Sequence, residues 1–184
     1  MAKMNGVKKF EKTVTRIMQK CTGINDFYCK LGSDWVYYNI KSKVEFSLLV
    51  NEDACKTWQN WIAERYDFDT DNLIMLSMLH EIGHHVTLNN FIINKEDRWN
   101  QEVKDVEDIE NTLAKSFLLP QQKEKLQKAY HSLPAEILAT EWAINFWQNN
   151  KKRVEKAFVK FCKAAIKFYA ANGLDENGNE LKAA

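Results

Sequence analysis

The segment His80-Glu81-Ile82-Gly83-His84 contains the residue types that bind a catalytic metal ion, at the spacing that a helix requires. Two histidines four residues apart lie one turn apart on the same helix face, so both imidazoles can bind one zinc ion (Zn2+) at about 2.0–2.1 Å. Glu81 lies about 100° around the helix from His80, where its carboxylate can take a proton from a metal-activated water. The spacing predicts His80 and His84 as metal ligands and Glu81 as the catalytic general base.

The helix that carries this motif is apolar on nearly every side, which predicts that it is buried. Leu76 and Gly83 flank the histidine face, and Leu79 and Ile82 line the opposite side. Buried imidazoles need partners, and a metal ion supplies one. Because Gly83 has no side chain, we expect it to leave room for a substrate or a neighbouring strand. The alternative is a helix of hydrogen-bonded core histidines without a metal.

A catalytic zinc site has three protein ligands, and we expect the third from a second helix that begins at Pro134. Glu136 and Glu141 lie about 140° apart on that helix, so only one of them can face the metal. Glu136 shares its face with small residues along which another helix can pack closely, and it is the predicted ligand. Glu141 lies on a more polar face. Glu107 and Glu110 are weaker candidates, since they lie in an acidic stretch that nothing places on a packed face.

The two remaining histidines have different predicted positions. His85 points about 100° away from His84 and is expected to be structural. His131 could approach the metal but is expected at the surface. Tyr130 and His131 are candidates for a donor that stabilises a transition-state oxyanion, and simple packing roles are the alternative.

Apolar spacing along the chain predicts an α+β protein that is mostly helical, with one small N-terminal sheet. The predicted strands, 27–29, 35–40 and 44–50, are expected to form a three-stranded meander in an antiparallel or mixed sheet. Residues 94–110 are acidic and weakly patterned, which predicts a mobile or partly helical connection. A single domain is expected over residues 1–173, followed by a flexible tail over 174–184. The predicted helices cover residues 3–20, 54–67, 72–88, 121–130, 134–149 and 151–172.

The composition is ordinary for a soluble globular protein: 45% of the 184 residues are hydrophobic, 28% are charged, and the net charge is +1. That net charge alone predicts no nucleic acid or membrane partner. We expect no membrane span, no signal peptide, and four free cysteines without a CxxC pair. The last predicted helix, 151–172, is rich in lysine. It is expected to be a solvated outer face, with nucleic acid or an acidic partner as the alternative.

The two motifs together resemble the gluzincins, metallopeptidases with HExxH on one helix and a glutamate on the next. More narrowly, they resemble the ImmA/IrrE-type family of bacteria and their phages, in which the second helix reads E-x-x-A-x-x-F-A. The segment from Glu136 to Ala143 keeps that pattern, with Trp142 in place of phenylalanine. The resemblance covers roughly residues 44–147, although the connection from His84 to Glu136 is longer than is usual in the family.

The resemblance implies a zincin-like fold with the sheet packed beside the HExxH helix. It also implies an intracellular zinc metallopeptidase that cleaves a protein such as a repressor, with His80, His84 and Glu136 as ligands and Glu81 as base. In such folds a strand holds the extended substrate, and residues 44–50 are the candidate. We expect a protein or peptide substrate, no membrane partner, and the cytoplasm of a bacterium or phage-infected cell. No helix-turn-helix is evident, so direct DNA binding is not expected.

Two other functional classes are alternatives to a metallopeptidase. One is a non-catalytic phage or bacterial interaction protein whose zinc site is structural or vestigial. The other is a zinc amidase that acts on a non-protein substrate, because the motif specifies how water is activated and not which bond is cleaved.

Overall fold

The structure, a computed structural model, describes residues 2–32, 37–39, 42–48, 52–94, 96–114 and 117–173. These ranges are mostly helical and include three short strands. The helices are α1 (Ala2–Thr22), α2 (Glu52–Tyr66), α3 (Leu73–Asn94), α4 (Glu96–Leu113), α5 (Pro120–His131), α6 (Pro134–Asn149) and α7 (Lys151–Ala171). The strands are β1 (Tyr28–Leu31), β2 (Tyr37–Asn39) and β3 (Lys43–Phe46).

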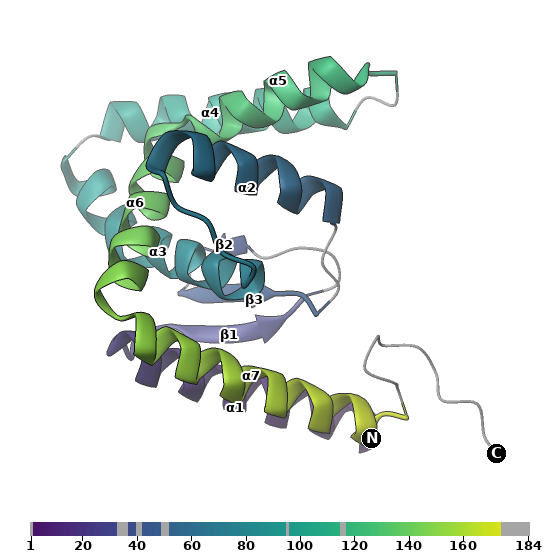
Figure 1. The fold of residues 1–184 in the computed structure, drawn as a ribbon. Coiled ribbons are helices and arrows are strands. Elements are labelled where there is room, and N and C mark those ends of the chain that lie inside the picture. Colours follow the sequence, from purple (N-terminus) through teal and green to yellow (C-terminus); the bar gives the residue numbers. More distant parts are fainter. Residues whose placement is uncertain are drawn as a thin grey trace. The chain divides into compact units, whose positions relative to one another are not determined.

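The chain divides into two compact units, which are described separately (Figure 1). The sheet unit consists of Met1–Val50 and Trp147–Ala184, and the helical unit consists of Asn51–Phe146. The expected single domain over residues 1–173, and the expected position of the sheet beside the histidine helix, both stay predictions. The expected flexible tail, 174–184, lies outside the described residues.

The sheet of the sheet unit is mixed, with the strand order β1-β3-β2. β1 pairs with β3 in parallel, and β2 pairs with β3 in the antiparallel sense. The predicted meander is therefore wrong, because β3 lies between the other two strands instead of at the end. Val44 and Phe46 of β3 are fully buried, and a strand paired on both sides is the natural place for such residues.

The central position of β3 also corrects the predicted substrate-binding strand. Lys43–Phe46 pairs with β1 along its whole length, and Lys43–Glu45 also pairs with β2, so residues 43–45 have no free strand edge for a peptide. The last two residues of the predicted strand, 49 and 50, lie outside the described residues.

Side chains of α1 occupy the outer edge of β1. The backbone N–H of Cys29 donates to Oγ1 of Thr15 at 2.9 Å, and the N–H of Leu31 donates to Oε1 of Glu11 at 3.1 Å. These bonds satisfy two of the edge groups that an outer strand leaves unpaired. They explain why β1 can end the sheet, which its sequence alone does not indicate.

Helices α1 and α7 lie side by side and antiparallel on the sheet (Figure 1). Phe10 of α1 stacks on Phe168 of α7 with a centroid distance of 4.5 Å, and Phe46 of β3 contacts both Phe10 and Phe161. Each helix is followed by a glycine with positive φ, +83° at Gly23 and +69° at Gly173, as expected for a helix end.

The helical unit is built around α3. Met75, Met78, Leu79 and Ile82 are completely buried, which confirms the prediction of a buried histidine helix. α3 continues to Asn94, beyond its predicted end at residue 88.

Residues 94–110 are predicted to be a mobile or partly helical connection, and the helical alternative holds in the described residues, because Glu96–Leu113 form the regular helix α4. Three apolar residues with helical spacing, Val106, Ile109 and Leu113, are partly buried on it. One row of apolar residues is enough to fix a helix against its neighbours, here α3 and α5.

Gly83 is the point at which α3 and α6 approach most tightly. A Cβ atom on Gly83 would lie 2.5 Å from the carbonyl oxygen of Ala139 and 3.0 Å from its Cα. The expected neighbour was a strand or a substrate, and the structure has a helix there instead. Ala139 and Ala143 are fully buried, as the predicted small-residue face of α6 requires.

The cysteines with described side chains, Cys21, Cys29 and Cys162, are free thiols, as expected. Burial raises the pKa of Cys21 to about 11 and that of Cys29 to about 12, so both stay protonated at neutral pH. The side chain of Cys55 lies outside the described part. None of the described helices has the length and apolar character needed to cross a membrane.

Candidate metal centre

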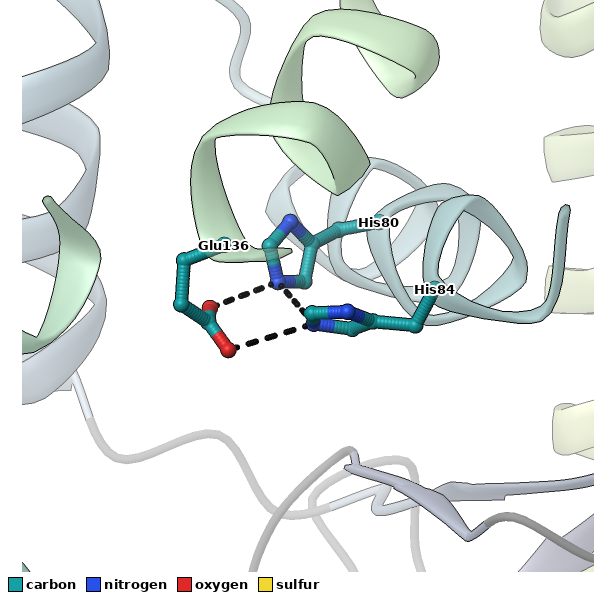
Figure 2. Close-up of side chains that lie close together, drawn as sticks. All are labelled: His80, His84 and Glu136. Atoms are coloured by element: carbon teal, nitrogen blue, oxygen red, sulfur yellow. Dashed lines mark hydrogen bonds and ion pairs between the residues drawn. The ribbon is translucent and has the colours of Figure 1, made fainter. Parts of the chain in front are cut away.

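Three predicted ligands come together between α3 and α6. Figure 2 shows the imidazoles of His80 and His84 on α3 facing the carboxylate of Glu136 on α6. Nε2 of His80 lies 3.1 Å from Oε2 of Glu136, and Nε2 of His84 lies 3.2 Å from Oε1. The two Nε2 atoms are 3.1 Å apart. Each carboxylate oxygen therefore faces one imidazole, and the three donors form a small triangle.

The size of this triangle fits a metal ion. Two ligand atoms that lie about 2.0–2.1 Å from a tetrahedral zinc are roughly 3.3–3.4 Å apart. The two Nε2 atoms, and each Nε2 and the carboxylate oxygen that it faces, are 3.1–3.2 Å apart, close to that value. One ligand atom from each of the three residues lies within 4.8 Å of the others. Among the described residues, His80, His84 and Glu136 form the group of His, Cys, Asp and Glu side chains that could hold a metal.

Charge and burial favour a cation at the same place. His80 is 5% exposed and Glu136 is 7% exposed. Burial lowers the pKa of His80, although its hydrogen bond with Glu136 partly opposes this. Burial raises the pKa of Glu136, but hydrogen bonds with both histidines outweigh it and hold that pKa well below its usual range. At neutral pH the centre therefore contains a buried carboxylate and a neutral imidazole, and a divalent cation would compensate that charge.

Thr140, one turn after Glu136 on α6, orients His80. Its Oγ1 lies 3.0 Å from Nδ1 of His80, and Thr140 is 1% exposed. When the hydroxyl accepts the Nδ1–H, the lone pair of Nε2 points at the triangle, which is the tautomer that a metal needs. The sequence alone does not indicate this role, since a threonine among alanines on a helix is expected to serve only in packing.

Glu81 and Tyr130 lie beside the three ligands. Glu81 is buried and is not part of the ligand group, and its role as a general base stays a prediction. Burial raises the pKa of Tyr130 well above its usual range, and the charges of Glu136 and Glu81 add to the effect. The phenol therefore stays protonated at neutral pH. A neutral hydroxyl thus lies close to both carboxylates.

His131 is half-buried and not fully exposed, which departs from the expected surface position. Its ring lies against Trp58, Trp61 and Tyr130, with centroid distances between 5.4 and 6.4 Å. Its Nδ1 is buried and has no hydrogen-bond partner among the described residues. His131 does not join the ligand group either. Three aromatic neighbours from α2 and α5 explain the burial, and none of them is close to His131 in sequence except Tyr130.

The weaker ligand candidates lie elsewhere. Glu141, Glu107 and Glu110 are exposed, so the structure favours Glu136 over each of them. His85 is buried on α3 outside the ligand group, as expected.

No protein-family model matches this chain, and no curated protein or solved structure matches it either. The geometry itself establishes a buried His-His-Glu group that could hold a metal ion. The resemblance to the gluzincins, and to the ImmA/IrrE type within them, depends on the two sequence motifs and on this group.

Proposed function

We propose that this protein is a zinc-dependent hydrolase, most specifically a metallopeptidase of the gluzincin kind that resembles the ImmA/IrrE type. The observation that carries the proposal is the convergence of His80, His84 and Glu136 within hydrogen-bonding distance, with Glu81 directly after the first ligand. The two-histidine, one-glutamate set is one that catalytic zinc sites use. The type of bond cleaved, the identity of the metal and the family resemblance are all parts of the proposal.

The number of ligands supports an enzyme over a structural zinc site. Structural zinc is bound by four protein side chains, whereas catalytic zinc keeps one position for water or substrate. In the described part of the chain, neither His131 nor a cysteine adds a fourth donor to the group. Three protein donors leave the fourth position of a tetrahedral ion for the reaction.

Bound zinc would supply Lewis acidity, which lowers the pKa of a coordinated water and polarises a substrate carbonyl. His80, His84 and Glu136 would hold the ion, and Thr140 would keep His80 in the required tautomer. Glu81 would accept the proton of the attacking water and deliver it to the leaving amine. Tyr130, with its protonated phenol, is the candidate donor to the developing oxyanion.

The first experiment measures the zinc content of the purified protein and of three variants. The wild type and Glu141→Ala should contain about one zinc per chain, and His80→Ala and Glu136→Ala should contain almost none. Glu141 is the matched control, since it is an exposed glutamate on the same helix. A wild type that stays metal-free when zinc is added would exclude the hydrolase.

The second experiment tests catalysis with a mixture of unstructured peptides, read by mass spectrometry. Glu81→Gln should retain zinc and lose about 10²–10⁴-fold in the rate of cleavage, because only the base is removed. Full zinc content without cleavage by the wild type would favour the structural or vestigial site. Hydrolysis of small acyl amides without peptide cleavage would favour the amidase.

A further inference from the structure

The charges of the chain are divided between its two units. The sheet unit has 17 lysine and arginine residues against eight aspartate and glutamate residues, and the helical unit has nine against 17. The net charge of +1 therefore conceals a strongly basic unit and a strongly acidic one. Such an asymmetry between parts of a chain points to a charged partner.

On α7 the cations form one row that borders α1. Arg153 begins this row, and its guanidinium donates two hydrogen bonds to the carbonyl oxygen of Lys20 on α1, at 2.7 and 3.1 Å. The other members follow at steps of three and four residues, which keeps them on the same edge of the helix. The row consists of Arg153, Lys156, Lys160, Lys163 and Lys167, all exposed.

A second row lies on α1, directly beside the first. Lys20 accepts the bonds from Arg153, so the rows meet at that end, and the packing of Phe10 on Phe168 brings the helices together at the other end. The second row consists of Lys9, Lys12, Arg16 and Lys20, also exposed. We name these nine side chains the basic face. It lies opposite the buried side of both helices, where Val14 and Val154 are fully buried.

No described carboxylate forms an ion pair with the basic face. Glu11 of α1 is turned toward the sheet and accepts the N–H of Leu31. Glu155 of α7 lies roughly 120° around the helix from its row of cations. An ordinary solvated helix mixes its charges, as α5 does with the Glu124–Lys128 pair at 3.1 Å. Nine like charges that form no ion pair with a described carboxylate repel one another, which favours a polyanionic partner.

We propose that the basic face binds the phosphate backbone of duplex nucleic acid. The row on α7 spans about 21 Å, the length of about six base-pair steps with roughly twelve phosphate charges. Packed helices lie about 8–10 Å apart, so the two rows can contact the two strands that border a groove. Backbone contacts need no helix-turn-helix, because they position a protein without reading bases. This binding is independent of the metal centre.

Two other polyanions fit the basic face less well. An anionic membrane is bound by apolar side chains among the cations, and the fully buried Val14 and Val154 lie on the side of the helices away from the basic face. The exposed Val159 and Ile166 lie beside the row on α7 and not within it. Single strands are bound with aromatic side chains on which bases stack, and the nine residues include none.

The test measures fluorescence anisotropy of a dye-labelled 20-base-pair DNA duplex, and of the matching RNA duplex, with the full chain at 25–300 mM salt. A dissociation constant of about 1–100 µM is expected near physiological salt. If five phosphates are neutralised, log K should fall with log salt at a slope of about −4.5. No binding at 25 mM salt, or a slope near zero, would overturn the proposal.

Two charge-reversed variants with the same net charge make the test specific. Lys156→Glu/Lys160→Glu/Lys163→Glu should weaken binding at least tenfold and reduce the slope by about 3. Lys123→Glu/Lys125→Glu/Lys128→Glu changes exposed lysines of α5 equally and should bind within twofold of the wild type. A milder set on α1, Lys9→Gln/Lys12→Gln/Arg16→Gln, should also weaken binding.

Equal losses in both charge-reversed variants would show a nonspecific charge effect and overturn the proposal. If the protein binds phosphatidylserine vesicles more strongly than duplex, and only the α7 variant loses this binding, the ligand of the basic face is a membrane and the proposal is overturned. Displacement of the duplex by an equal charge concentration of polyglutamate would favour an acidic protein. DNA and RNA duplexes bound alike fit backbone recognition, and preference for one identifies the source of the phosphate.

Discussion

At the scale of single residues, the metal centre depends on a hydroxyl that binds no metal. Oγ1 of Thr140 lies 3.0 Å from Nδ1 of His80, while the opposite nitrogen of the same ring faces Glu136. Such outer partners fix the tautomer and the orientation of a ligating imidazole. Thr140 therefore controls which nitrogen of the His80 ring carries the proton.

Replacing Thr140 with valine should therefore weaken metal binding without removing a ligand. Thr140→Val keeps the side-chain size and should lower zinc affinity about 10–100-fold, as loss of an outer partner typically does. Thr140→Ser keeps the hydroxyl and should stay within about threefold of the wild type. Competition with a chromophoric chelator measures both affinities. Equal affinities of Thr140→Val and wild type would show that the hydroxyl only packs.

The ligands could be predicted from sequence because they depend on local spacing. HExxH places two imidazoles on one helix face, and the small residues after Glu136 indicate which carboxylate lies on a packed face. The neighbours of the ligands could not be predicted in this way. Thr140 meets His80 only across two helices, and His131 is buried by Trp58 and Trp61, far away in sequence.

At the scale of elements, most helix bounds followed from local signals, except the end of α3 and the helix α4, and the sheet order did not. Helix ends are marked by residues such as Gly23 and Gly173, which adopt a positive φ. Strand order instead depends on contacts with other elements. β1 reaches the sheet edge because Glu11 and Thr15 of α1 bond its backbone, and β3 becomes central because of its buried side chains.

The crossing of α3 and α6 is the packing contact on which the metal centre depends. Gly83→Ala would place a Cβ atom 2.5 Å from the carbonyl oxygen of Ala139, a backbone atom that cannot rotate away. Alanine improves helix propensity by about 1 kcal/mol, but the overpacking should cost about 1–3 kcal/mol and more where backbones collide. We expect a net loss of stability in urea unfolding and a lower zinc affinity, since α6 carries Glu136.

Gly6→Ala on α1 is the matched control for Gly83→Ala. A Cβ atom at Gly6 meets nothing within 4 Å, so only the helix propensity changes. This variant should gain about 0.5–1 kcal/mol and bind zinc like the wild type. A Gly83→Ala protein as stable as Gly6→Ala would show that α6 can shift freely.

At the scale of the whole molecule, the net charge does not describe how charge is distributed between the two units. A value of +1 predicted no polyanion, yet the two units have opposite excesses of charge. The sequence places lysines at helical spacing on two helices 130 residues apart. Only the pairing of α1 with α7, fixed by contacts such as Arg153 to Lys20, brings the two rows together. The charge of a surface therefore depends on tertiary pairing and not on composition.

Buried His131 should make the stability of the protein depend on pH. Burial lowers the pKa of His131 from 6.5 to about 4, against the opposing charge of Glu136. Between these pH values the unfolded chain binds a proton that the folded chain does not, so the free energy of unfolding falls as the pH falls. The full contribution is present above pH 6.5, and roughly 3 kcal/mol is lost by pH 4. His131→Phe keeps a ring between Trp58 and Trp61 and removes the titrating group.

Urea unfolding of the wild type and His131→Phe, at pH 7.5 and pH 5.0 with a chelator present, isolates this effect from loss of metal. From pH 7.5 to pH 5.0, the free energy of unfolding of the wild type should fall by about 2 kcal/mol more than that of His131→Phe. The other titratable groups are the same in both proteins, so the difference between their pH profiles reports the titration of His131. Parallel pH profiles would mean that the imidazole is solvated in the folded protein. A difference of the expected sign would instead show that α5 packs on α2 with a neutral histidine, next to the helix that carries the metal ligand Glu136.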